Sequence, residues 1–334
     1  MERDYNLDFL RGGVMLYIVL VIHGLTNFYY VAVDSWIVSM LLFEMPLIFY
    51  ISGAAYKLSR KKSLKELIVS RFYRVILPYY VYAIFVIVAI CVLKNDVSFD
   101  DLKYVLCIQN APALPYSNQI WFIVPYFIVS ILGKFYYAIY ERNKQYLLFL
   151  CGLFVFVIML LDYMGYNNFF ISLFREVIVY SLFFIMGFSY KEAISNRIIM
   201  LVISSFLIAL FILSSLGYEW VMQYNKFPPN LFFIFYGMIY LIVFYKILMS
   251  VRFPRWKIVD KWNKYGMEIY LYQNFAFWGI SAVYAYLGFT ASIMQYVVTI
   301  FLLFSALTLI APYINRLNVW SAEMVKQVVY KVCK

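Results

Sequence analysis

Long apolar runs, separated by short polar segments, follow one another along almost the whole chain. Each run is roughly 17–25 residues long, which is the length that a helix rising about 1.5 Å per residue needs to cross a hydrocarbon core of about 30 Å. The pattern therefore predicts an all-α polytopic membrane protein that forms a single domain over residues 1–334. About ten transmembrane helices are expected, at residues 12–32, 35–55, 76–94, 119–138, 146–162, 169–189, 197–216, 229–249, 267–286 and 292–312.

The composition agrees with a membrane as the solvent and excludes a water-soluble globule. Apolar residues make up 65% of the chain and charged residues only 13%, about half of the share that a soluble domain carries. The N-terminal segment carries acids among its bases and precedes a long apolar run without a small-residue cleavage site. We therefore expect the first helix to stay in the protein instead of being removed as a signal peptide.

The basic residues do not form one patch, so the net charge of +11 predicts no nucleic-acid partner. Apart from Lys94, Lys103, Lys226 and Arg175, the 28 lysines and arginines lie in alternate polar segments. The positive-inside rule then places both termini in the cytoplasm, in agreement with an even number of spans. The longest segment on the opposite side, residues 95–118, could form a short lid helix.

The chain offers no sequence signature of a metal site. Its four cysteines show no CxxC pairing, and it has only one histidine. Neither a zinc nor a haem site can be built from that set of side chains. We therefore expect no metal and no permanently bound cofactor.

Ionisable side chains within the predicted spans are functional candidates, because each is costly to insert into a bilayer. His23 lies twelve residues beyond Arg11, which places it about 18 Å deeper along the helix and near the middle of the membrane. Its imidazole is either hydrogen-bonded across a helix interface or a general base, since the pKa of histidine lies closest to the working pH. Glu44 on the second span is another candidate, and a position facing His23 is one hypothesis for it.

A second group of polar residues lies toward the outer side. Arg175 and Glu176 are adjacent and therefore point about 100° apart on a helix, so each needs another partner. With nearby Asp162 they could line a polar cavity that binds sugar hydroxyls, or they could form a buried ion pair between helices. Trp121 and Glu44 are further candidates for contact with such a substrate.

The segment 57–74 carries seven bases and one acid beside the membrane. Topology and anionic lipid explain most of these bases. Arg71 and Arg74 differ, because their i, i+3 spacing predicts one shared helix face at the mouth of the third span. Two planar guanidinium groups there could clamp a polyphosphate such as that of coenzyme A, which is available in the cytoplasm.

Three segments in this order resemble the membrane-bound acyltransferase-3 family. They are LDFLRGGVMLYIVLVIHG at residues 7–24, MPLIFYISGAAY at 45–56 and SRFYRVILPYY at 70–80. Weaker similarities follow at residues 118–127, 183–190 and 265–277. The set extends over nearly the whole chain.

Two positions depart from the family pattern. Eleven residues separate Arg11 from His23, where the family usually has ten, and a step of twelve ends about 120° away from the starting face of a regular helix. An irregular helix start at Gly12 and Gly13, a local bulge, or a looser role of Arg11 would each account for the spacing. Gln273 stands where the family often has a histidine, so no second titrating imidazole is expected there.

The resemblance implies an O-acyltransferase that uses cytoplasmic acyl-CoA, with acetyl as the default acyl group. The implied acceptor is a hydroxyl of a polysaccharide or glycolipid on the far side of the membrane, here expected to be a bacterial cytoplasmic membrane. We expect Arg71 and Arg74 to hold the CoA phosphates, and Asp8 and Arg11 to shape the cytoplasmic vestibule. His23 would act as a general base or carry the acyl group as an acyl-imidazole.

Two other classes of protein fit the pattern less closely. A transporter for a polysaccharide or a lipid-linked intermediate would also bury charges in ten spans, but the chain lacks Gly/Pro-broken helix pairs in corresponding halves. A scaffold subunit of a polysaccharide synthase is the other alternative. Only the enzyme would release free CoA in the presence of an acceptor.

Overall fold

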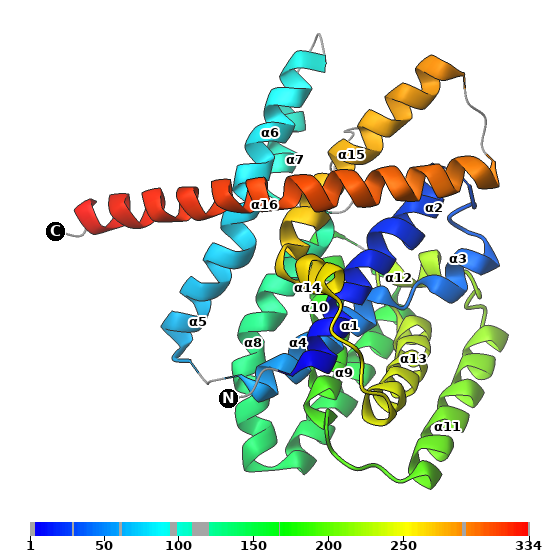
Figure 1. Ribbon diagram of the computed structural model, residues 1–334. Coiled ribbons are helices and arrows are strands. Elements are labelled where there is room, and N and C mark those ends of the chain that lie inside the picture. Colours follow the sequence, from blue (N-terminus) through cyan, green and yellow to red (C-terminus); the bar gives the residue numbers. More distant parts are fainter. Residues whose placement is uncertain are drawn as a thin grey trace. The chain divides into compact units, whose positions relative to one another are not determined.

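The computed structural model describes residues 4–28, 30–59, 62–93, 99–108, 120–166, 168–288 and 292–332, which form helices without a β-strand among them (Figure 1). Contacts between residues divide the chain into two compact units. The first unit contains residues 1–14, 31–61 and 128–256, and the second contains residues 15–30, 62–127 and 257–334.

Nine helices in the described part of the chain are long and apolar enough to cross a membrane. The remaining predicted span, 267–286, corresponds to α15 (Gly266–Leu287), whose 22 residues are about 33 Å long but less apolar, since they include Glu268, Gln273 and Asn274. The all-α polytopic fold is confirmed. The nine apolar segments are Tyr5–Asn27, Trp36–Leu58, Leu64–Val92, Ile120–Arg142, Lys144–Met164, Phe169–Ser189, Asn196–Ser215, Leu231–Ser250 and Ile293–Val329.

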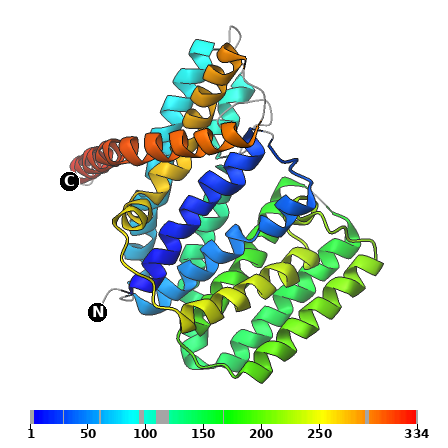
Figure 2. The ribbon, with the colours of Figure 1, turned by 45° about the vertical axis from the view of Figure 1, so that its right-hand side comes forward.

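In the first unit, five long helices lie side by side (Figure 2). The approach of α4 to α10 and to the short helix η4 (Gly187–Ser189) requires glycine, because a Cβ atom on Gly53 would lie 1.8 Å from the carbonyl oxygen of Phe184. Backbone therefore packs directly on backbone here. The five helices are α4 (Glu44–Leu58), α9 (Lys144–Met164), α10 (Phe169–Met186), α11 (Asn196–Ser215) and α13 (Leu231–Ser250). The unit also contains most of α1 (Tyr5–Leu16) and α8 (Ile123–Arg142) and the shorter α3 (Trp36–Leu41) and α12 (Met222–Lys226).

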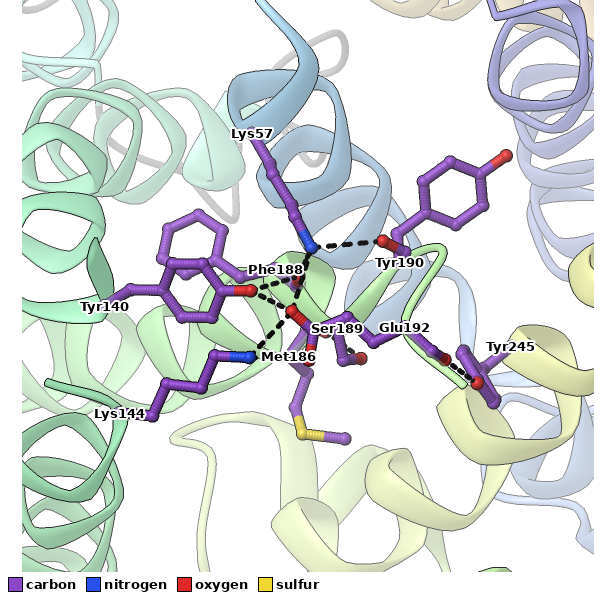
Figure 3. Close-up of polar contacts among 9 residues, drawn as sticks. All are labelled: Lys57, Tyr140, Lys144, Met186, Phe188, Ser189, Tyr190, Glu192 and Tyr245. Atoms are coloured by element: carbon purple, nitrogen blue, oxygen red, sulfur yellow. Dashed lines mark hydrogen bonds and ion pairs between the residues drawn. The ribbon is translucent and has the colours of Figure 1, made fainter. Parts of the chain in front are cut away.

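A polar cluster around Glu192 joins three helices of this unit (Figure 3). The Glu192 carboxylate accepts hydrogen bonds from Lys57 of α4 (3.1 Å), from Lys144 of α9 (3.0 and 3.1 Å) and from the hydroxyl of Tyr140 in α8 (Ile123–Arg142). Burial raises the pKa of Glu192, but the hydrogen bonds from Tyr140, Lys144 and Lys57 and the charge of Lys57 outweigh it and lower the pKa below its ordinary value. The ionised carboxylate therefore holds the helix ends together.

The first helix of the chain changes its geometry along its length. It begins as α1 (Tyr5–Leu16), continues as the π-helical segment η1 (Tyr17–His23) and ends as α2 (Gly24–Asn27). A second π-helical segment, η2 (Phe72–Ile76), joins α5 (Leu64–Arg71) to α6 (Leu77–Leu93). Both π-helical segments belong to the second unit.

The longest helix of the second unit is α16 (Ile293–Val332), which packs against α15, α6 and α2. Its 40 residues continue well beyond the predicted end of the last span at residue 312 (Figure 1). Of the predicted lid, residues 99–106 form α7 (Phe99–Leu106), which packs against α6, while residues 95–98 and 109–118 lie outside the described part of the chain. The remaining elements are η3 (Ile120–Phe122) and α14 (Lys257–Lys264).

Candidate functional site

The single histidine of the chain faces α15. His23 is the last residue of η1 and is half-buried. Its Nδ1 atom lies 2.9 Å from Oε1 of Gln273, and its ring centroid lies 6.4 Å from those of Tyr270 and Phe277. The imidazole is thus held in a defined orientation within the second unit.

The orientation of the Gln273 amide determines the tautomer of His23. The Gln273 side chain is fully buried, and its Nε2 donates a hydrogen bond to the backbone carbonyl of Tyr270 at 2.7 Å. This bond directs the amide oxygen toward His23, and because an oxygen of this kind can only accept, Nδ1 carries the hydrogen. The neutral ring then has its lone pair on Nε2, which is the form that a general base requires.

The π-helical segment η1 explains the unusual spacing of Arg11 and His23. A turn closed by i→i+5 hydrogen bonds holds about one residue more than an α-helical turn, and such bulges occur frequently at functional sites. Because η1 lies between the two residues, it takes up the additional one. Gly12 and Gly13 lie within the α-helical part, so among the three explanations the structure shows the local bulge.

The second π-helical segment lies at the arginine pair. Arg71 ends α5, and Arg74 lies within η2, where the N–H of Leu77 bonds to the carbonyl of Phe72. In this wider turn, side chains three residues apart diverge more than in an α-helix, and Arg71 is half-buried while Arg74 is exposed. Neither guanidinium forms a hydrogen bond or an ion pair with the residues that the structure describes, so both charges are available to an anion.

Helices α15 and α16 connect the helix of His23 with the helix of the arginines. Helix α16 packs against both η1 and α6, and Asn274, next to Gln273, donates a hydrogen bond to the hydroxyl of Tyr82 on α6 at 3.3 Å. Tyr82 lies eight residues beyond Arg74, or about 12 Å along the helix. The hydrogen bond between Asn274 and Tyr82 therefore lies about two helical turns away from Arg74.

The predicted vestibule residues lie on α1. Asp8 and Arg11 are both half-buried and stand one turn apart. They belong to the first unit, whereas His23, Arg71 and Arg74 belong to the second.

Arg175 forms a buried ion pair with Asp162. Only 5% of Arg175 is exposed, and its guanidinium bonds to the carboxylate of Asp162 and to the carbonyl of Pro229 (3.2 Å). Asp162 also accepts hydrogen bonds from the hydroxyl of Tyr218 (3.0 Å) and the N–H of Leu231 (3.1 Å). Both side chains are thus hydrogen-bonded to other groups of the protein. This geometry matches a buried ion pair between helices, which is the alternative to a cavity that binds sugar hydroxyls.

The other predicted acceptor residues are distributed over both units. Glu44 is 2% exposed and pairs with Lys226, a partner 182 residues away that sequence reasoning did not find. Among the described residues, Oε2 of Glu44 has no hydrogen-bond partner. Glu176 is half-buried on α10, and Trp121 is half-buried in η3, with its ring centroid 6.4 Å from that of Phe122.

The fold and these sites define a multi-pass membrane protein with a half-buried imidazole and an arginine pair in one unit. The sequence profile of the acyltransferase-3 family, described as an acyltransferase domain, matches residues 4–315. The chain belongs to this family and is a membrane acyltransferase. No curated protein and no solved structure matches it.

Proposed function

We propose that this acyltransferase moves an acyl group, with acetyl as the default, from cytoplasmic acyl-CoA to a hydroxyl of a polysaccharide or glycolipid in a bacterial cytoplasmic membrane. The observation that carries the proposal is the hydrogen bond between His23 and Gln273. It supports an imidazole with a hydrogen on Nδ1, so that the neutral form of the ring has its lone pair on Nε2, where it can accept a proton. The arginine pair supports an anionic donor, because guanidinium groups bind phosphates in a bidentate manner.

In the proposed reaction, Arg71 and Arg74 bind the phosphates of CoA while the thioester reaches His23. Nε2 of His23 takes the proton of the acceptor hydroxyl as its oxygen attacks the thioester carbonyl. The new C–O bond replaces the C–S bond, and the imidazolium gives its proton to the departing sulfur. General-base catalysis of this kind contributes about 10²–10⁴-fold to the rate.

A two-step form of the reaction uses the same nitrogen. Nε2 of His23 would attack the thioester itself, and the resulting acyl-imidazole would then transfer the acyl group to the hydroxyl. Incubation with radiolabelled acetyl-CoA in the absence of acceptor distinguishes the two forms, because only the second leaves label on the protein.

The test is transfer of radiolabelled acetyl from acetyl-CoA to candidate glycans by the full chain in proteoliposomes. The His23→Ala variant is expected to lose about 10²–10⁴-fold of the acceptor-dependent release of CoA. Thr26→Val is a matched control, since Thr26 lies one turn further on the same helix and, within the described part of the chain, its hydroxyl bonds only to the carbonyl of Ile22 (2.9 Å). An equal rate in His23→Ala would remove His23 from the mechanism, and a transporter would release no CoA at all.

A further inference from the structure

The C-terminal part of α16 extends beyond what a membrane span requires. Its 40 residues are about 60 Å long, twice the thickness of a hydrocarbon core. The family profile ends at residue 315, so the last part of the helix lies outside the matched region. This extension carries Lys326, which is exposed.

Lys326 lies beside the segment that carries the arginine pair. Its Nζ is 5.0 Å from the ring centroid of Tyr73, and Tyr73 stands between Arg71 and Arg74 in the sequence. A lysine above an aromatic ring is attracted by the negative face of the ring, which restricts where its ammonium group can lie. The ammonium group of Lys326 is thus held beside the segment that carries the two arginines.

The position of the extension is fixed by a buried contact. Asn318 of α16 donates a hydrogen bond to Glu268 of α15 at 2.9 Å, and both residues are buried. Asn318 precedes Lys326 by eight residues, or about 12 Å along the helix. Since α16 also packs against α6, the helix that carries Lys326 is anchored on the same unit as the arginines.

None of the three cations, Lys326, Arg71 and Arg74, has an ion-pair partner in the described part of the chain. The acid closest in sequence on the arginine side, Glu66, accepts hydrogen bonds from the N–H (2.8 Å) and hydroxyl (2.9 Å) of Ser63 in a helix cap. Glu323 precedes Lys326 by three residues on α16 but forms no ion pair with it, and cations without an ion-pair partner can attract a group with several negative charges.

We propose that Lys326 is a third cation of the site that binds the phosphate groups of the acyl donor. This inference rests on the proposed function, because it takes Arg71 and Arg74 as the donor site. Their planar guanidinium groups bind phosphate oxygens in pairs, and the ammonium adds a point charge. The phosphate groups of anionic lipids share this chemistry, so the test separates the two sources.

The experiment measures binding of CoA to the full chain in nanodiscs of phosphatidylcholine, at low and at high salt. Lys326→Ala is expected to weaken CoA binding about fivefold at low salt, and the difference should shrink at high salt because exposed charges are screened. Lys326→Arg should retain the affinity. Arg316→Ala is the matched control, since Arg316 is an exposed cation of the same helix that lies over Tyr313 (5.6 Å) and not over Tyr73.

Several outcomes would overturn the inference. The first is equal CoA affinity of wild type and Lys326→Ala in the neutral bilayer, and the second is an equal loss in Arg316→Ala. A third is an effect of Lys326→Ala only on binding of the protein to vesicles that contain phosphatidylserine, which would assign the lysine to lipid. If wild type itself bound no CoA, the proposed function would fail together with this inference, whereas the first three results leave the proposed function intact.

Discussion

Replacement of Gln273 by leucine tests the link between the buried amide and His23, the proposed general base. Leucine has a similar size but cannot accept the hydrogen of Nδ1, so the 2.9 Å bond to His23 is lost. A buried donor left without a partner costs about 1–3 kcal/mol. If the activation free energy rises by this full amount, acyl transfer slows by about 5- to 150-fold, because each 1.36 kcal/mol is a factor of ten in rate.

The variant should change kcat more than the KM for acyl-CoA. Gln273 contacts His23 and the backbone of Tyr270, so in the proposed mechanism it would position the base and not bind the donor. A group that acts only on the chemical step lowers kcat and kcat/KM together. Steady-state kinetics with acetyl-CoA and a glycan acceptor measure this division.

A direct readout is available because the chain has only one histidine. Nitrogen NMR of protein labelled with ¹⁵N-histidine therefore reports on His23 alone, and the two ring nitrogens distinguish the tautomers. We expect hydrogen on Nδ1 in the wild type and a mixture of tautomers in Gln273→Leu. Gln295→Leu is the control, since it makes the same replacement at a side-chain oxygen that has no hydrogen-bond partner among the described residues.

Two results would refute this reasoning. A wild-type ring with its hydrogen on Nε2 would contradict the orientation of the Gln273 amide. A tautomer that is identical in wild type and Gln273→Leu, with unchanged kcat, would show that the amide does not act on His23.

Three further predictions concern stability, each measured by thermal unfolding of the purified protein. Gly53→Ala should prevent native packing, because the new Cβ would lie 1.8 Å from a backbone oxygen, whereas Gly152→Ala has no atom within 4 Å and should be tolerated. Asp162→Asn should destabilise the fold by about 3–5 kcal/mol, because it leaves the buried charge of Arg175 with neutral partners alone; a change in acceptor KM without loss of stability would instead favour substrate binding. Glu192→Gln should lower the free energy of unfolding by about 1 kcal/mol at neutral pH. Because the pKa of Glu192 is lowered in the folded state, the wild type should lose this advantage as the pH falls below the ordinary value of 4.5; equal pH profiles of the two proteins would contradict the role of the cluster.

The helices could be predicted from the sequence because the membrane dictates their length and polarity. The fifth predicted span, residues 146–162, lies within α9 (Lys144–Met164), and the eighth, 229–249, nearly coincides with α13 (Leu231–Ser250). The apolar pattern does not predict where helices continue into polar segments. The first helix begins at Tyr5, ahead of the predicted residue 12, and α16 continues 20 residues beyond the predicted end.

The partners of the candidate residues in each unit could not be predicted, because they depend on packing between distant segments. Gln273 lies 250 residues from His23, and Lys226 lies 182 residues from Glu44. The sequence marks Gln273 only as a position where the family often has a histidine. No periodicity in the sequence indicates that its amide contacts the imidazole of His23. Arg175 and Asp162 are only 13 residues apart, which is why their proximity could be expected from the sequence.

The π-helical turn at Tyr17–His23 has a consequence for how such a helix can evolve. One codon added to a regular helix swings every later side chain by about 100° around the axis, which would turn a reactive group away from its substrate. A π-helical turn accommodates the additional residue locally, so the side chains that follow keep their orientation around the helix axis. Descendants that gain or lose a residue at this place can therefore conserve the same chemistry, even though their alignments differ in length.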